Sequence, residues 1–249
     1  MGHLIDFKGE NVSGNFDLNL LYQIDNSTVY IMDNHLIASW CWAQQIDLSK
    51  KYTLIHIDRH FDLGKLGNVF SRSEVCSNLQ KGVRNITEMT YSTIMREDHV
   101  LFTWCNYIFL FNEAFPEVIN SSYFIVDDAN QNNESGDCEY LDTLNPNHCI
   151  PINELPNINN SIILNLDIDF FCKCNGADTY DFRDDYKHQI DLLKIWYLKN
   201  KENVKVFTIA LSPEMCSHDR GWEISKGILM EVSEALELDI KHENIFKKD

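Results

Sequence analysis

The stretch YTLIHIDRHFD, residues 52–62, joins an apolar run to the motif D-x-H-x-D. Continuous rather than alternating hydrophobicity is typical of a strand that is covered on both faces, as in a parallel sheet. Alternate residues of a strand share a face, so we expect Asp58, His60 and Asp62 to converge just past the carboxyl end of this strand. That edge is where open α/β sheets bind ligands.

Two further apolar runs end in side chains of the same kind. Residues 162–169 end in the D-x-D motif of Asp167 and Asp169, and residues 28–32 are followed by His35. If these segments are parallel neighbours of the first strand, all of these side chains face one site at the same edge of the sheet.

Other segments complete the pattern of an α/β fold. Residues 123–126 and 204–211 are further apolar, β-branched runs, while residues 184–199 and 222–238 carry apolar residues at helical spacing. Strands that alternate with helices predict a three-layer sandwich, with a mostly parallel central sheet and helices on both faces.

Length and composition bound the class of protein. The chain has 249 residues, of which 44% are hydrophobic, so we expect one α/β catalytic domain over residues 1–249. No run approaches the ~20 apolar residues of a membrane-spanning helix, and no secretory signal is present, so we expect a cytoplasmic protein without a membrane partner. A formal net charge of −17 repels a phosphate backbone, which argues against nucleic acid as a partner.

The eight cysteines are scattered along the chain, and we expect free buried thiols rather than a disulfide framework. Cys172 and Cys174 form the one close pair. A C-x-C motif without a second pair is a weak zinc signal.

Carboxylates gathered at one edge of a sheet need a counter-charge. Within a few Å they repel one another and raise one another's pKa values unless a cation lies between them. Two divalent ions balance four carboxylates, and oxygen ligands with some imidazole favour Mn²⁺ over zinc. The sequence therefore predicts two Mn²⁺ ions per chain, with six ligands: His35, Asp58, His60, Asp62, Asp167 and Asp169. Paired metals lower the pKa of a shared water toward neutrality, so hydrolysis is the expected chemistry.

Each of these residues taken alone has a simpler explanation. Asp58 alone is more often a turn former, and His35 beside Asp33 and Asn34 fits a turn. The metal site is favoured because coincidence would otherwise have to place several such residues, at alternating spacing, at the ends of apolar strands.

The D-x-H-x-D motif, the D-x-D motif and the upstream histidine resemble the arginase, agmatinase and deacetylase superfamily. In its ureohydrolase branch, the resemblance implies a binuclear manganese centre. By motif, His35 resembles the upstream histidine on one metal, Asp58 and Asp167 the bridging carboxylates, Asp62 the remaining ligand of that metal, and His60 and Asp169 the ligands of the other.

A closer resemblance is to the peptide arginases, which convert arginine side chains of ribosomally made precursor peptides to ornithine. The resemblance is carried by Asp33-Asn34-His35 with Trp40 and Trp42, and by residues 56–63, 166–171 and 208–214. It implies an arginase/deacetylase-like fold and a role in natural product biosynthesis.

Glu214 follows the apolar run 204–211, which places it at the same edge of the sheet. A carboxylate holds a guanidinium by two parallel hydrogen bonds, and in arginases a glutamate after a late strand has that role. Glu214 is therefore the expected substrate-binding residue, and Asp58, His60 and Glu214 are the expected catalytic set. The alternative is an exposed loop glutamate after Ser-Pro.

The sequence also departs from the family pattern. Phe170, Phe171 and Cys172 follow D-x-D, where ureohydrolases usually have a further Asp and a Pro. No histidine lies between Asp62 and His99 to serve as the proton shuttle of the free amino-acid enzymes.

We therefore expect a Mn²⁺-dependent amidinohydrolase that acts on arginine side chains of a peptide and releases urea. Two alternatives stay open. One is a hydrolase of a small guanidino compound or an acetylated amine, and the other is a non-catalytic, metal-stabilised module that binds peptides. The sequence does not predict the oligomeric state.

Overall fold

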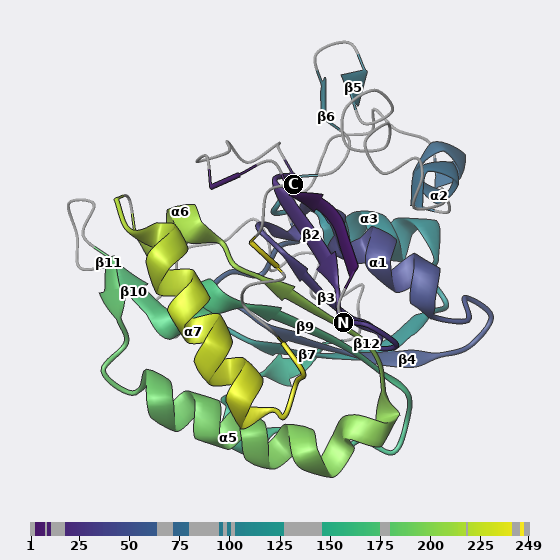
Figure 1. Ribbon diagram of the computed structural model, residues 1–249. Coiled ribbons are helices and arrows are strands. Elements are labelled where there is room, and N and C mark those ends of the chain that lie inside the picture. Colours follow the sequence, from purple (N-terminus) through teal and green to yellow (C-terminus); the bar gives the residue numbers. More distant parts are fainter. Residues whose placement is uncertain are drawn as a thin grey trace.

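The computed structural model describes residues 3–7, 9–10, 18–63, 72–79, 95–96, 99–100, 103–126, 146–174, 180–217, 219–240 and 245–246. Within these ranges the chain forms an α/β fold, in which helices pack against a mostly parallel sheet (Figure 1). The α/β class and the mostly parallel sheet expected from the sequence are confirmed. No helix in the described ranges has the length and apolar character needed to cross a membrane.

Among the described residues, the main sheet has eight strands in the order β1-β2-β3-β12-β9-β4-β7-β8. In chain order these are β1 (His3–Phe7), β2 (Leu20–Gln23), β3 (Val29–Met32), β4 (Tyr52–Ile57), β7 (Ile119–Ile125), β8 (Pro146–Cys149), β9 (Ile162–Asp167) and β12 (Val204–Ala210). Neighbours from β3 to β8 are parallel, whereas β1 and β2 add antiparallel pairings at one edge. Two short antiparallel pairs lie outside this sheet: β5 (Met95–Arg96) with β6 (His99–Val100), and β10 (Cys172–Cys174) with β11 (Tyr180–Phe182).

Each face of the central strands contributes to its own hydrophobic cluster. Adjacent residues of one strand join different clusters, as Leu54 and Ile55 of β4 do. This explains the continuous apolar runs in the sequence, because a strand buried on both faces has no polar side.

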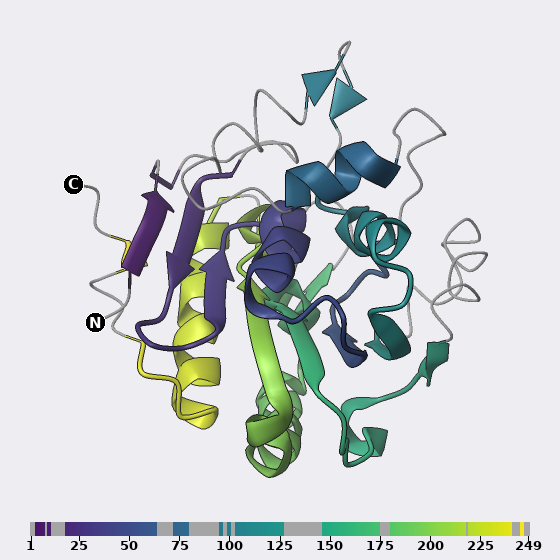
Figure 2. The same cartoon turned by 90° about the vertical axis from the view of Figure 1, so that its right-hand side faces the viewer.

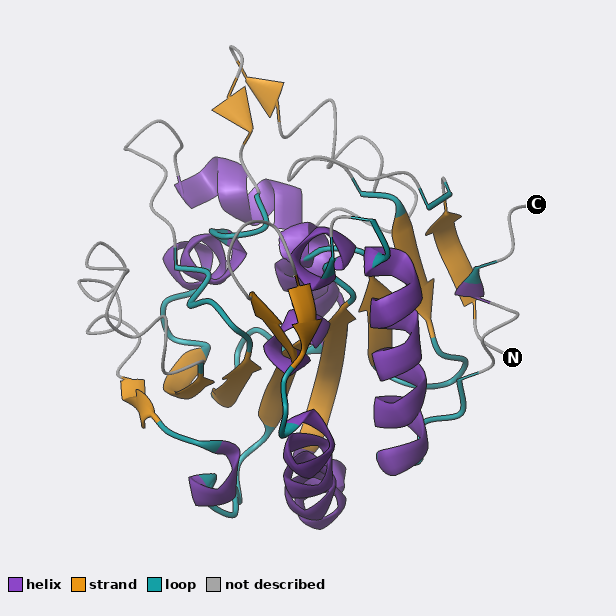
Figure 3. Ribbon diagram, turned by 90° about the vertical axis from the view of Figure 1, so that its left-hand side faces the viewer, coloured by secondary structure: helices purple, strands orange, loops and turns teal. Residues whose placement is uncertain are grey.

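The helices divide between the two clusters. Helices α1 (Ala38–Gln45), α2 (Arg72–Leu79) and α3 (Tyr107–Ala114) contribute to one, and α5 (Tyr186–Asn200) and α7 (Gly221–Ala235) to the other. Figure 2 looks onto the side of α1 and α3, and Figure 3 looks onto the side of α5 and α7. The short helices are η1 (His35–Ile37), η5 (Ile152–Glu154), η6 (Ile168–Phe171), η7 (Lys201–Asn203) and α6 (Pro213–Cys216).

The register of the parallel strands brings four chain segments to one edge. Ala210, the last residue of β12, pairs with Met32 on one side and with Asp167 on the other. Leu166 pairs with Ile57, the last residue of β4. The segments that follow β3, β4, β9 and β12 therefore leave the sheet side by side.

Candidate metal centre

The strand-end motifs converge through tight turns. Strand β4 ends at Ile57, and the Asp58 carboxylate then accepts the backbone N–H of His60 at 2.7 Å. Strand β9 ends at Asp167, whose carboxylate accepts the backbone N–H of Asp169 at 2.9 Å. Such turns, in which an aspartate accepts the N–H two residues on, are a common way for the chain to leave a strand.

The sequence predicted that Asp58, His60 and Asp62 converge because alternate residues of a strand share a face. That reason was wrong, because these residues do not belong to the strand. Asp58, His60 and Asp62 follow β4, and Asp169 belongs to η6. Asp62 has a φ of 52°, in the left-handed region that aspartate tolerates better than most residues.

His35 is held at the same edge by its two predecessors. The Asn34 side chain caps η1 by accepting the backbone N–H of Leu36 at 2.9 Å. The buried Asp33 carboxylate accepts the backbone N–H groups of Asn19 and Leu20, each at 3.0 Å. Asp33 and Asn34 therefore have the turn role that their residue types suggested, and they set the position of His35.

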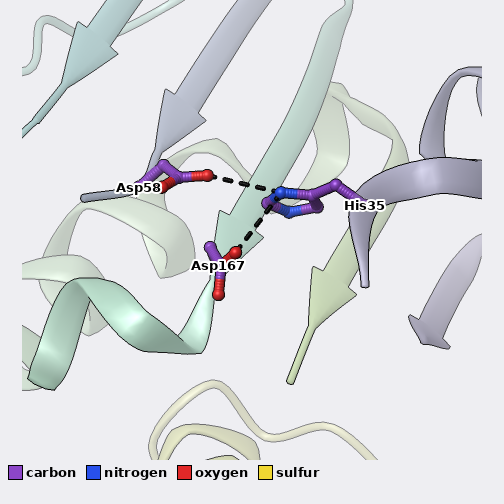
Figure 4. A group of neighbouring side chains, drawn as sticks. All are labelled: His35, Asp58 and Asp167. Atoms are coloured by element: carbon purple, nitrogen blue, oxygen red, sulfur yellow. Dashed lines mark ion pairs between the residues drawn. The ribbon is translucent and has the colours of Figure 1, made fainter. Parts of the chain in front are cut away.

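Three carboxylates approach one nitrogen of His35. Its Nδ1 lies 3.0 Å from Asp62 Oδ2, 3.3 Å from Asp58 Oδ2 and 3.4 Å from Asp167 Oδ2. Figure 4 shows Asp58 and Asp167 pointing toward the His35 ring from neighbouring segments. All four side chains are at most 6% exposed, so solvent contributes little to separating their charges.

A second group forms around His60. Its Nδ1 lies 3.3 Å from Asp169 Oδ2 and 3.4 Å from Asp58 Oδ1. The two carboxylate oxygens of Asp58 thus face two different histidines, with Oδ2 toward His35 and Oδ1 toward His60. Asp58 joins the two groups into one cluster.

The pKa values of the cluster reflect crowded carboxylates. Burial opposes protonation of His35 and His60, but the neighbouring carboxylates outweigh it, so the pKa of His35 lies well above its usual range and that of His60 is about 12. Burial, then the charge of Asp58, raises the pKa of Asp62 to about 7. Burial, then the charges of Asp169 and Asp58, also raise the pKa of Asp167 well above its usual range. Carboxylates and histidines this close together need either bound protons or a cation as counter-charge.

The donor set fits a divalent metal ion. Within the described ranges, the carboxylates of Asp58, Asp62, Asp167 and Asp169 form ion pairs with histidines alone. The Oδ2 atoms of Asp58 and Asp169 are buried and have no hydrogen-bond partner. Three groups have ligand atoms within 4.8 Å of one another: His35, Asp58 and Asp167; His56, Asp58 and Asp62; and Asp58, His60 and Asp169. These buried His and Asp residues can hold a metal ion.

A pocket opens onto this cluster. Its lining residues include Asp33, Asn34, His35, His60, Asp62, Trp104, Asp167, Asp169, Ser212, Pro213, Glu214 and Met215. Glu214 lies in the first turn of α6, and its Oε1 is buried without a hydrogen-bond partner. Burial raises the pKa of this carboxyl group. Glu214 therefore lies at the expected edge, in a pocket that five of the six predicted ligands also line; Asp58 is the sixth and lies behind them.

Ser212 was not predicted from the sequence. Its hydroxyl donates to Asp167 Oδ2 at 2.5 Å, and its backbone N–H donates to the Asp33 carbonyl oxygen at 2.8 Å. Its φ of 40° is left-handed and turns the chain from β12 into α6. The one signal in the sequence was its place next to Pro213, at the start of a short helix.

The remaining candidates have structural roles or are not described. Trp40 and Trp42 lie in α1 and are buried in the core, as expected of aromatic residues there. Phe170 and Phe171 are buried on the α5 and α7 side, which accounts for the apolar residues after D-x-D. The side chain of His99, which was considered as a proton shuttle, lies outside the described residues.

The described cysteines are free thiols: Cys41, Cys76, Cys105, Cys172 and Cys216. The side chain of Cys174 is not among the described ones. None of the described groups that can hold a metal ion contains a cysteine, so the C-x-C motif contributes no ligand to them.

Neither a scan against models of known protein families nor a search of curated proteins finds a match for this chain. A functional assignment therefore depends on the geometry of this site.

Proposed function

We propose that the chain is a Mn²⁺-dependent amidinohydrolase of the arginase/deacetylase-like, three-layer type, which converts arginine side chains of a peptide to ornithine and releases urea. One observation carries the proposal. A single pocket is lined both by the His and Asp cluster and by Glu214, whose buried Oε1 has no hydrogen-bond partner. A cytoplasmic role in peptide natural product biosynthesis is part of the same proposal.

Six residues would hold two Mn²⁺ ions. His35 and Asp62 would hold one ion, and His60 and Asp169 the other. Asp58 and Asp167 would be shared by both ions, as the resemblance implies. Paired divalent ions supply a water of lowered pKa and polarise the group under attack. Oxygen ligands with some imidazole suit Mn²⁺, which is why that ion is preferred over zinc.

Glu214 would bind and orient the substrate. A guanidinium is planar and presents parallel N–H donors, which match the two oxygens of a carboxylate. The free Oε1 of Glu214 would gain a partner, and the raised pKa of its carboxyl group indicates a site that lacks a nearby positive charge. The substrate would supply that charge.

The pocket lining favours a guanidine without a neighbouring carboxylate. A free amino acid carries an α-carboxylate that needs a cation, and the described lining contains neither lysine nor arginine. An arginine within a peptide has no free α-carboxylate. The net charge of −17 also attracts cationic peptides toward the protein by long-range electrostatics. The same lining makes an amine such as agmatine the second candidate.

Urea release tests the proposal. The Mn²⁺-loaded protein is incubated separately with an arginine-containing peptide, agmatine and free arginine, and the products are analysed by mass spectrometry. We expect urea and a peptidyl ornithine from the peptide, and none with the Asp58→Ala variant. Urea from agmatine alone would favour the second candidate. Absence of urea from every guanidine, with metal bound, would refute the amidinohydrolase.

A further inference from the structure

Directly beneath the proposed metal ligands lies a layer of buried polar residues. His56 in β4 pairs with Asn165 in β9, and Asn165 pairs with Thr208 in β12. His56 and Asn165 each precede a candidate ligand by two residues, Asp58 and Asp167 respectively. All three layer residues are fully buried, so each polar atom depends on a protein partner.

The hydrogen bonds of this layer have a fixed direction, which begins at Trp42. The indole N–H can only donate, and it donates to Thr208 Oγ1 at 3.0 Å. Thr208 therefore directs its own hydroxyl hydrogen to Asn165 Oδ1, at 2.6 Å. This contact fixes the orientation of the Asn165 amide, so that its NH₂ group points away from Thr208.

The next hydrogen bonds lead to the D-x-H turn, which is formed by Asp58, Arg59 and His60. Asn165 Nδ2 lies 2.9 Å from His56 Nδ1, 3.0 Å from the hydroxyl oxygen of Tyr107 and 3.4 Å from His35 Nε2, so its two hydrogens go to the two shorter contacts. Because Nδ2 donates, His56 Nδ1 must accept, and the ring proton of a neutral His56 must lie on Nε2. That nitrogen lies 3.0 Å from the carbonyl oxygen of His60, to which it donates.

We propose that Thr208, Asn165 and His56 are positioning residues that fix the D-x-H turn for metal binding. The chain of donors from Trp42 to the His60 carbonyl holds the backbone between Asp58 and His60, and these two side chains complete the His60 group of the cluster. The metal-binding part rests on the proposed function. The protonation of His56 on Nε2 does not, because it follows from hydrogen-bond direction alone.

The first test measures the tautomer of His56 directly. Two-bond ¹H–¹⁵N correlation spectra of the imidazole groups distinguish a proton on Nε2 from one on Nδ1, and the His56→Gln variant assigns the signals. We expect a neutral His56 with its proton on Nε2 at neutral pH. A proton on Nδ1, or on both nitrogens, would overturn the proposal, whether or not the protein binds metal.

The second test breaks the chain at Thr208. The Thr208→Val variant keeps the shape of the side chain but removes both the acceptor for Trp42 and the donor to Asn165. The matched control is Thr53→Val, because Thr53 is also buried and bonded to a hydroxyl, that of Ser121, but lies outside the layer. Mn²⁺ affinity is measured from the electron paramagnetic resonance signal of the free ion.

We expect Thr208→Val to lose the single His56 tautomer and to weaken Mn²⁺ binding by roughly 10- to 100-fold, as removal of groups that orient metal ligands does. Thr53→Val should change neither. If Thr208→Val does not fold, Thr208→Ser must retain both properties while Asn165→Leu loses them. An unchanged tautomer and affinity in Thr208→Val would refute the positioning role. Absence of Mn²⁺ binding by the unmodified protein would refute the metal centre instead.

Discussion

Asp58 is the residue on which both halves of the cluster depend. Its Oδ2 faces His35 and its Oδ1 faces His60, and the turn after β4 is closed by its own bond to the His60 N–H. Burial raises the pKa of Asp58, but the nearby His35 and His60 rings outweigh this effect and hold that pKa below its usual range. An ionised carboxylate at this position is what the proposed metal centre requires.

A change at Glu214 should weaken substrate binding and turnover but leave the affinity for the metal ion unchanged. Replacing it with Gln keeps the shape and removes the charge that would face a guanidinium. We expect kcat/KM for an arginine peptide to fall roughly 10- to 100-fold, since hydrogen bonds to charged groups contribute about 1.5–3 kcal/mol. Mn²⁺ affinity should not change. The control is Glu154→Gln, an exposed glutamate in η5, and equal losses in both variants would refute the role of Glu214.

The protonation of the cluster predicts the pH dependence of metal binding. The pKa of His60 is about 12, that of Asp62 is about 7, and that of His35 lies well above its usual range. A metal must displace these protons, so Mn²⁺ affinity should fall as the pH falls from 8 to 6, by at least about tenfold per pH unit. Calorimetry in buffers of different ionisation enthalpy would measure the protons released. An affinity that is flat over this range would contradict the prediction.

At the element scale, the position of Glu214 depends on how closely α7 approaches α6. A Cβ added to Gly221 would lie 1.8 Å from the carbonyl oxygen of Pro213, a backbone atom that cannot move without moving α6. We expect Gly221→Ala to destabilise the protein by about 1–3 kcal/mol and to raise KM for the substrate. Urea denaturation and steady-state kinetics would check both effects.

The control lies in the same helix. A Cβ added to Gly227 meets no atom within 4 Å, so Gly227→Ala should stabilise α7 by up to about 1 kcal/mol, through helix propensity alone. KM should not change in this variant. If the two alanine variants behave alike, close packing of α7 against α6 does not position Glu214.

The sequence predicted those strands that are buried on both faces and therefore appear as continuous apolar runs. Residues 52–57 form β4 as expected, because both faces of that strand are covered. Helix α3 was missed because YIFLFNEA is apolar on most sides and shows no clear helical period. The sequence indicated that His56 is buried or supports a ligand, but its pairing with Asn165 was missed, since this pairing depends on strand register that one sequence does not display.

At the scale of the whole molecule, metal binding should stabilise the fold. The candidate ligands come from the carboxyl end of β9 and from the segments that follow β3, β4 and β9, so a bound ion joins parts of the chain that are far apart in sequence. At about 100 times its Kd, a ligand that binds only the folded state contributes about 2.7 kcal/mol, which raises Tm by roughly 5–10 °C in a chain of this size. Thermal scans with Mn²⁺ and with a chelator would show this difference. The Asp58→Asn variant should show no such rise, and an equal rise in that variant would place the metal elsewhere.

The site residues could be predicted where their position depends only on which residues end or follow a strand in the sequence. All six predicted ligands and Glu214 lie around one pocket or in the groups behind it, because each follows a strand whose carboxyl end reaches the same edge. The left-handed turns at Asp62 and Ser212 could not be predicted, since they depend on the packing of neighbouring segments.

The most direct measurement is an anomalous difference map from crystals grown with Mn²⁺, collected near the manganese absorption edge. The proposed metal centre should give two peaks, one on either side of Asp58: one near His35 and Asp62, and the other near His60 and Asp169. The map of the Asp58→Asn variant should lose both. A crystal with no peak beside Asp58, or with manganese bound only elsewhere on the chain, would contradict the central claim.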